Sequence, residues 1–337
     1  MHEPECSRPL DLGGDINEGL LMKYQKRELS PLQPFRLLPW FSKRVWGRLD
    51  LRPWYGSPGT LDPIGEAWLT GPECVVETGT LAGRTLASVV ADVGESLGGA
   101  EFPLLVKMLF PNDKLSVQVH PDDAQAQSMG YARGKTECWY VLEAKSGATV
   151  ALGLRKGVTA VGVAEAVADG SLEGLLVHIP VSVGDMVFVD AGTVHAIGAG
   201  VVLLETQQTS DVTFRLYDDG RPRELHLQQA LRVMKTQTAA GKIMPKAMNG
   251  FMRLIEQQYF IVDRYEVTAD RKAVVAVDEA SCLVGLEGTA LVEGVAVESV
   301  ELLQGQAVVL PAGSGSLRVQ SHGNASFLRC FAPATKG

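Results

Sequence analysis

Short strand-like segments separated by glycine-containing turns recur along most of this 337-residue chain. Aromatic and β-branched residues favour strands, while glycine, asparagine and aspartate mark the turns between them. A chain with many short strands folds into a sandwich or a barrel, so we predict a mainly β protein. The clearest strand segments read PLLVKMLF (103–110), ATVALGL (148–154), DMVFVDAG (185–192) and VVLLETQQ (201–208).

Three helical segments interrupt this pattern. PDDAQAQSM (121–129) begins with a proline and two acidic residues, which favour the first turn of a helix. VAEAVADGSLEGLL (163–176) predicts a second helical insert, and LHLQQALRVMKTQ (225–237) predicts a third. We expect the third helix to lead into a C-terminal domain.

Four potential metal ligands lie in or beside predicted strands. Gln118 and His120 are two residues apart and flanked by valines, so both project from the same strand face. Glu137 stands at the entrance of the strand CWYVLEA, and His195 follows a glycine turn at 191–192. Two imidazoles with a carboxylate and an amide oxygen suit zinc and leave a coordination position free, although other divalent metals would also bind. The pattern predicts a metalloenzyme.

The segment GDMVFVDAGTVHAIGAG (184–200) resembles the second metal-binding motif of the cupin family, with Asp190 where proline is usual. Further segments match in order and with compatible spacing from about Leu32 to the C-terminus. Together they resemble the type I mannose-6-phosphate isomerases of the cupin superfamily. These segments are WGRL (46–49), IGEAWLTG (64–71), SVQVHPDD (116–123), GKTECWYV (134–141) and LLETQQTSDVTFRLYD (203–218).

This resemblance implies a cupin-type double-stranded β-helix and a metal-dependent aldose-ketose isomerase. The reaction it implies interconverts mannose 6-phosphate and fructose 6-phosphate through a cis-enediol, with a phosphorylated hexose as substrate. It also implies one Zn²⁺ per chain. The implied zinc ligands are Gln118, His120, Glu137 and His195.

A second chemical cluster comprises Glu205, Asp211 and Arg215, which we expect to return toward His195 in a hairpin around the GAG turn at 198–200. The family resemblance assigns Arg215 to the negative charge of the enediolate, a task that suits a permanently charged guanidinium.

The general base stays open among four residues, because the choice depends on distances. We favour Glu205, which matches the family's carboxylate at that spacing. Ser116 and Lys135 match positions that the family uses close to the substrate, and we place Asp211 there too. Capping or packing explains His178 and His226 adequately, so neither is included in the site. The four candidate bases are Glu205, Lys135, Asp211 and His120.

Composition narrows the class of protein and its compartment. The net charge of −8 argues against nucleic-acid binding, and no apolar stretch approaches the roughly 20 residues of a membrane helix. Five widely separated cysteines without a CxxC motif are typical of reduced thiols, so we expect a cytoplasmic protein. The sequence leaves the oligomeric state open between monomer and homodimer.

We predict three parts along the chain. Residues 1–31 form a loosely ordered extension, residues 32–250 the catalytic cupin domain with its helical inserts, and residues 251–337 a second, degenerate cupin-like β domain. The segment GQAVVLPAGSGSL (305–317) echoes 184–197, with Ser316 where His195 stands. We therefore expect the second domain to lack a metal.

Three alternatives stay open at this point. A cupin dioxygenase could use two histidines and a carboxylate, but Gln118, Lys135 and Arg215 suit a phosphosugar better. A sugar-phosphate-binding cupin without turnover is the second alternative. The third is an isomerase for another aldose phosphate, such as glucose 6-phosphate, because epimers differ in a single hydroxyl.

Overall fold

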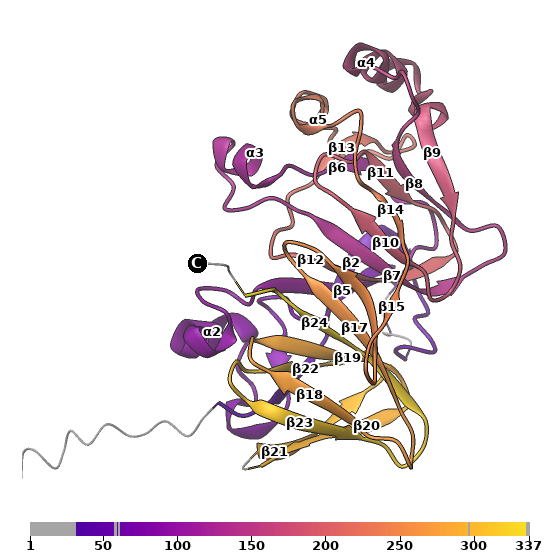
Figure 1. Cartoon of the computed structure of the whole chain (residues 1–337). Coiled ribbons are helices and arrows are strands. Elements are labelled where there is room, and N and C mark those ends of the chain that lie inside the picture. The colour runs from indigo at the N-terminus through magenta and orange to yellow at the C-terminus, as the bar shows by residue number, and fades with distance from the viewer. Residues whose placement is uncertain (1–31, 57–58, 60, 296, 335–337) are drawn as a thin grey trace, which may run out of the picture. The chain divides into compact units, whose positions relative to one another are not determined.

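The computed structural model describes residues 32–56, 59, 61–295 and 297–334, so the extension predicted for residues 1–31 lies outside the described residues. Within the described part, antiparallel strands form four sheets, with a small number of short helices (Figure 1). This confirms the predicted mainly β fold with small helical inserts.

Two sheets enclose the core of the metal-ligand half. Trp139, Val187 and Leu203 of the first sheet pack against Val150 and Ile197 of the second. The seven-stranded sheet has the order β14 (Gly241–Ile243), β10 (Met186–Val189), β7 (Glu137–Ala144), β12 (Val201–Gln208), β5 (Leu104–Leu109), β3 (Ile64–Trp68), β2 (Trp40–Arg48). The five-stranded sheet has the order β13 (Phe214–Tyr217), β6 (Val117–Val119), β11 (His195–Ile197), β8 (Thr149–Leu154), β9 (Leu176–Pro180).

The predicted hairpin around residues 198–200 is wrong. Strand β11 pairs with β6 and β8, whereas β12 pairs with β5 and β7 in the other sheet. Every residue of β12 is buried, so both of its edges and both of its faces need neighbours. The glycine turn therefore carries the chain from one sheet to the other, with Gly200 at a φ of +78°.

The three predicted helical segments are confirmed as α3 (Asp123–Ser128), α4 (Ala160–Asp169) and α5 (Leu227–Val233). Helix α3 begins with a capping box in which Asp122 accepts from the Gln125 amide and Gln125 accepts from the Asp122 amide. Helices α4 and α5 pack on the five-stranded sheet through an apolar cluster that includes Val163, Ala230 and Phe214 (Figure 1). Helix α2 (Leu86–Val93), capped by Thr85, was not predicted. The 3₁₀ turns are η2 (Gly79–Leu81), η3 (Gly94–Leu97) and η4 (Leu172–Leu175).

The C-terminal half is a second pair of packed sheets. Tyr265, Leu283 and Phe327 face Val275 and Leu317 across its core. The eight-stranded sheet has the order β15 (Lys246–Ala247), β16 (Met252–Glu256), β17 (Ile261–Val267), β24 (Ala325–Phe331), β19 (Ser281–Glu287), β22 (Ala307–Leu310), β1 (Phe35–Leu38), β4 (Val75–Val76). The four-stranded sheet has the order β18 (Ala273–Val277), β23 (Gly315–Gln320), β20 (Thr289–Gly294), β21 (Val297–Leu303).

Segments from the start of the described chain complete this C-terminal sheet. Strand β1 pairs with β22, with Phe35 opposite Val309, and β4 pairs with β1. A boundary between 250 and 251 stays a prediction, and a domain cut there would leave β22 without the strand that covers its edge.

The helices of the described residues include none that is long and apolar enough to cross a membrane. Cys74, Cys138, Cys282 and Cys330 are free thiols in the interior.

Candidate active site

Three of the predicted ligands meet between the two sheets of the first half. His120 follows β6, Glu137 begins β7 and His195 begins β11, and their ligand atoms all lie within 4.8 Å of one another. His195 Nε2 is 3.4 Å from Glu137 Oε1, and His120 Nε2 is 3.6 Å from Glu137 Oε2. All three side chains are buried, so this is a group that could hold a metal ion.

Hydrogen bonds at the outer nitrogens fix both imidazole tautomers. His120 Nδ1 lies 2.8 Å from the Val212 carbonyl oxygen and His195 Nδ1 lies 2.9 Å from that of Thr193. A carbonyl only accepts, so each Nδ1–H donates and each Nε2 presents a lone pair toward Glu137. Burial lowers the pKa of His195 to about 4 and holds the pKa of His120 well below its usual range, with Lys135 adding to the effect. Two neutral imidazoles oriented in this way suit a metal ion.

Gln118 lies beside this group because it is the register partner of His195. Its Nε2 is 3.3 Å from His195 Nε2. The two ends of an amide exchange positions on a 180° rotation, so Oε1 can take the same place. The structure thus brings all four predicted ligands together.

Glu137 has no solvent exposure, and neither carboxylate oxygen accepts an aligned hydrogen bond. Lys135 Nζ lies 2.7 Å from Oε2 as an ion pair, but this contact leaves the second oxygen without a partner. A buried carboxylate that lacks hydrogen bonds is costly unless a cation completes its surroundings. The donor set and the unpartnered Oε1 therefore fit a divalent cation.

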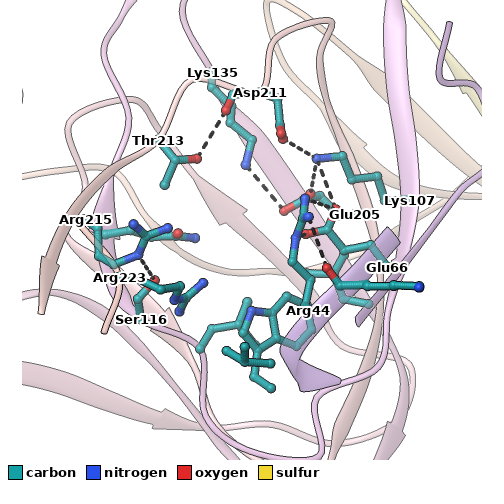
Figure 2. A pocket seen from close by; sticks show the side chains of 16 residues that line it. Arg44, Glu66, Lys107, Ser116, Lys135, Glu205, Asp211, Thr213, Arg215 and Arg223 are labelled. Atoms are coloured by element: carbon teal, nitrogen blue, oxygen red, sulfur yellow. Dashed lines mark hydrogen bonds and ion pairs between the residues drawn. The ribbon is translucent and has the colours of Figure 1, made fainter. Parts of the chain in front are cut away.

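A cavity of about 510 Å³ opens beside this group (Figure 2). It is rich in cations, with six basic side chains against three acidic ones, although the chain as a whole carries −8. Such a site favours an anionic ligand. The lining residues are Lys43, Arg44, Val45, Trp46, Glu66, Lys107, Leu109, Leu115, Ser116, Gln118, Lys135, Glu205, Asp211, Thr213, Arg215 and Arg223.

Glu205 lies on the cavity wall, where its carboxylate is close to one indole N–H and two lysine ammonium groups. Trp139 Nε1 donates to its Oε1 at 3.3 Å, Lys135 Nζ lies 3.8 Å from Oε1, and Lys107 Nζ lies 3.9 Å from Oε2. Burial raises the pKa of Glu205 to about 7, even though Lys135 opposes that change. Burial also disfavours the charged Lys135, but Glu137 and Glu205 outweigh it and raise the Lys135 pKa. A carboxylate with this pKa can accept and release a proton near neutral pH.

A buried lysine that was not predicted organises the same wall. Lys107, 2% exposed, donates to Asp211 Oδ1 at 2.6 Å and lies 4.0 Å from Glu66 Oε2. Arg44 holds Glu66 through two hydrogen bonds of 2.9 and 3.2 Å. Burial alone would raise the Asp211 pKa, but Lys107 lowers it. The signal was present in the sequence, since Lys107 is the charged residue inside the apolar segment PLLVKMLF.

Arg215, Arg223 and Ser116 gather on another side of the cavity (Figure 2). Arg215 Nε donates to Ser116 Oγ at 3.3 Å. Arg223, which sequence reasoning also missed, is held by the buried Asp218 through bonds of 2.5 and 2.6 Å. Burial and the nearby Arg223 lower the pKa of Arg215 from its very high usual value.

Asp190, where the cupin motif usually has proline, stabilises the turn before His195 by hydrogen bonds. Its carboxylate accepts from Thr193 Oγ1 at 2.7 Å and from the Ala239 amide at 3.1 Å. Gly192 at the turn has a φ of +90°. The aspartate thus ties the turn before His195 to the segment that follows α5.

Comparisons with known proteins agree with this architecture. A family model described as phosphomannose isomerase type I, catalytic domain, matches residues 34–155. The mannose-6-phosphate isomerase of Streptococcus mutans serotype c is 39% identical over 215 residues, which cover 60% of this chain and 68% of that protein.

Solved structures share the fold over most of its length. The mannose 6-phosphate isomerase from Bacillus subtilis has a TM-score of 0.79 and 30% identity, covering 89% of this chain and 99% of its own. A mannose 6-phosphate isomerase bound with zinc and yttrium has a TM-score of 0.70 and 15% identity, covering 89% of this chain and 100% of its own.

The family resemblance seen in the sequence is confirmed by these matches, as are the cupin fold and an isomerase activity on a sugar phosphate. The chain belongs to the type I phosphomannose isomerase family.

Proposed function

We propose that this enzyme interconverts mannose 6-phosphate and fructose 6-phosphate with one divalent metal ion held by Gln118, His120, Glu137 and His195. The observation that carries the proposal is the buried Glu137 carboxylate, whose oxygens lack aligned hydrogen bonds and face two neutral imidazole nitrogens. Nitrogen and oxygen donors in this ratio favour zinc, and other divalent transition metals fit the same set. When bound, the ion would polarise or position the sugar oxygens as a Lewis acid.

The basic side of the cavity supports binding of a phosphorylated sugar. Arg223 and Ser116 lie beside Arg215, and we assign Arg223 and Ser116 to the phosphate. Arginine presents a planar set of donors that matches phosphate oxygens. Lys135 and Asp211 line the same cavity and supply contacts to sugar hydroxyls.

Proton transfer in the proposed reaction uses a carboxylate. Glu205 takes the proton from C2 of the aldose, the electron pair forms the C1–C2 double bond, and the C1 carbonyl oxygen gains a proton. Transfer of that proton from Glu205 to C1, while O2 gives up a proton that balances the one gained by O1, gives the ketose. The burial of Glu205 and its pKa of about 7 support this role.

Arg215 stabilises the enediolate that forms between these two transfers. Its guanidinium stays charged and faces the cavity that holds Glu205, so it opposes the negative charge that develops on O1 and O2. We also propose a cytoplasmic location, which the free interior thiols support.

A coupled assay in D₂O tests the substrate and the mechanism together. We expect fructose 6-phosphate from mannose 6-phosphate, with deuterium from solvent at C1 of the product. Deuterium at C1 would exclude a direct hydride shift, whereas its complete absence would require, under the enediol mechanism, that the buried Glu205 return the same proton without exchange. Faster turnover of glucose 6-phosphate than of mannose 6-phosphate would contradict the proposed substrate but not the isomerase class.

A further inference from the structure

Arg215 lies on the edge strand β13 of the five-stranded sheet. Strand β13 is the first strand of this sheet, so β6 is its neighbour on one side, where Gln118 lies opposite Arg215. An edge strand leaves backbone N–H and C=O groups that need partners. At Arg215 both groups point to His226: the Arg215 N–H donates to His226 Nδ1 at 3.2 Å, and the His226 N–H donates to the Arg215 carbonyl at 2.7 Å.

His226 thus takes the place of a residue in a neighbouring strand, with a ring nitrogen where a strand would present a carbonyl. Because a backbone N–H is the donor, Nδ1 must be unprotonated and the ring proton must be on Nε2. Sequence reasoning attributed this histidine to capping or packing. It is the N-cap residue of α5, yet its side chain makes no capping hydrogen bond.

The residue is fixed from several directions. Its carbonyl accepts from the Ala230 amide at 2.9 Å and so begins α5. Its ring packs near Phe214, with ring centroids 6.2 Å apart. The imidazole is therefore held at the edge of β13 rather than free to turn into solvent.

The same short segment also holds the Arg215 side chain. Arg215 Nη1 donates to the Glu224 carbonyl at 2.8 Å. Among the residues that the structure describes, no carboxylate oxygen lies within 4.0 Å of this guanidinium. Neutral acceptors orient the arginine without cancelling its charge, so the charge stays available to an anion in the cavity.

We propose that His226 is a positioning residue for Arg215: its neutral imidazole fixes the edge of β13 so that the guanidinium faces the reacting oxygens. This inference rests on the role proposed for Arg215. Because His226 acts through Arg215, its loss should lower kcat more than it changes KM, and only while Arg215 is present.

Two substitutions separate the hydrogen bond from simple packing. His226→Leu keeps the bulk and removes the acceptor, and we expect kcat to fall about tenfold, as for loss of one well-placed hydrogen bond near a catalytic group. His226→Asn places Oδ1 at the same number of bonds as Nδ1 and should recover most of that loss. Metal content should stay equal in both. If instead kcat follows thermal stability in both variants and Asn gives no recovery, His226 has only a structural role.

A double-mutant cycle tests the route through Arg215. In an Arg215→Ala background, His226→Leu should change kcat by less than about twofold. A full tenfold effect in that background would overturn the inference while leaving the role of Arg215 intact. A wild-type rate for Arg215→Ala alone would overturn that role, and the inference with it.

Nitrogen-15 NMR of the imidazole gives a readout that does not depend on activity. In the resting protein we expect the ¹⁵N chemical shift of a protonated nitrogen at Nε2 and that of an unprotonated, hydrogen-bonded nitrogen at Nδ1. A ring with the proton on Nδ1 would show that the bond to Arg215 is absent and would overturn the inference.

Discussion

Replacing Lys107 with methionine should destabilise the protein strongly at neutral pH. The Lys107 ammonium is 2% exposed and lies 2.6 Å from Asp211, 3.9 Å from Glu205 and 4.0 Å from Glu66. Removing one partner from a buried ion pair costs roughly 3–5 kcal/mol. The Asp211 side chain is 48% exposed, and solvent screening reduces its share. We therefore expect Lys107→Met to lower the free energy of unfolding by about 3 kcal/mol, the lower end of that range.

This loss should depend on pH in a defined direction. Lys107 lowers the Asp211 pKa, so it contributes stability that is present above the unfolded value of about 3.9 and lost as pH falls through the folded pKa. The Glu205 pKa is raised to about 7, so stability falls as pH rises from the unfolded value of about 4.3 to that pKa, and Lys107 limits the fall because it lowers the Glu205 pKa. The difference between wild type and Lys107→Met should be largest at pH 8, smaller at pH 5 and smallest below pH 4.

Urea unfolding at these pH values measures the difference directly. Lys242→Met is a matched control, because Lys242 also forms a short ion pair, 2.6 Å from Asp185, but with 38% and 26% of the two side chains exposed. The control should lose no more than about 1 kcal/mol. Two results would refute the view that Lys107 balances this carboxylate cluster. One is a loss of unfolding free energy below about 1 kcal/mol for Lys107→Met at pH 8. The other is a difference between wild type and Lys107→Met that is no smaller at pH 5 than at pH 8.

Three further substitutions test the assigned roles. Arg215→Ala should retain metal but lower kcat by about a hundredfold or more, as for loss of a transition-state donor, measured by coupled assay and metal analysis; a wild-type rate would exclude the role. His195→Ala should lose metal and activity together, and full metal content in that variant would show that His195 is no ligand. The wild-type acid limb of kcat/KM should lie near pH 7, because Glu205 must be ionised to act, and Glu205→Gln should abolish that limb and slow turnover by about 10²–10⁴. An unchanged limb in Glu205→Gln would assign the base elsewhere.

The proximity of Gln118, His120, Glu137 and His195 could be predicted because strand geometry is local. Alternation along β6 places Gln118 and His120 together, Glu137 opens the next buried strand, and a glycine turn precedes His195. Each of these signals lies within a few residues of the side chain that it positions. The helices with acidic starts or clear helical periodicity were predicted for the same reason.

Features that depend on distant strand pairing could not be predicted. The segment 198–200 has the sequence of a hairpin turn, but the full burial of β12 requires β5 and β7 as its neighbours. The role of Lys107 depends on Asp211, which is 104 residues away in the chain. His226 looks like a helix cap in the sequence, and only the position of β13 at a sheet edge reveals its bond to Arg215.

The most direct test of the proposed metal dependence is a coupled assay of mannose 6-phosphate turnover with purified protein before chelation, after chelation and after Zn²⁺ is restored. Glu137→Gln, which removes the buried negative charge from the ligand group, is assayed alongside. We predict that wild-type activity is lost on chelation and recovered with about one zinc per chain, while Glu137→Gln binds metal weakly and stays inactive. Undiminished turnover by the fully metal-free protein would contradict the account.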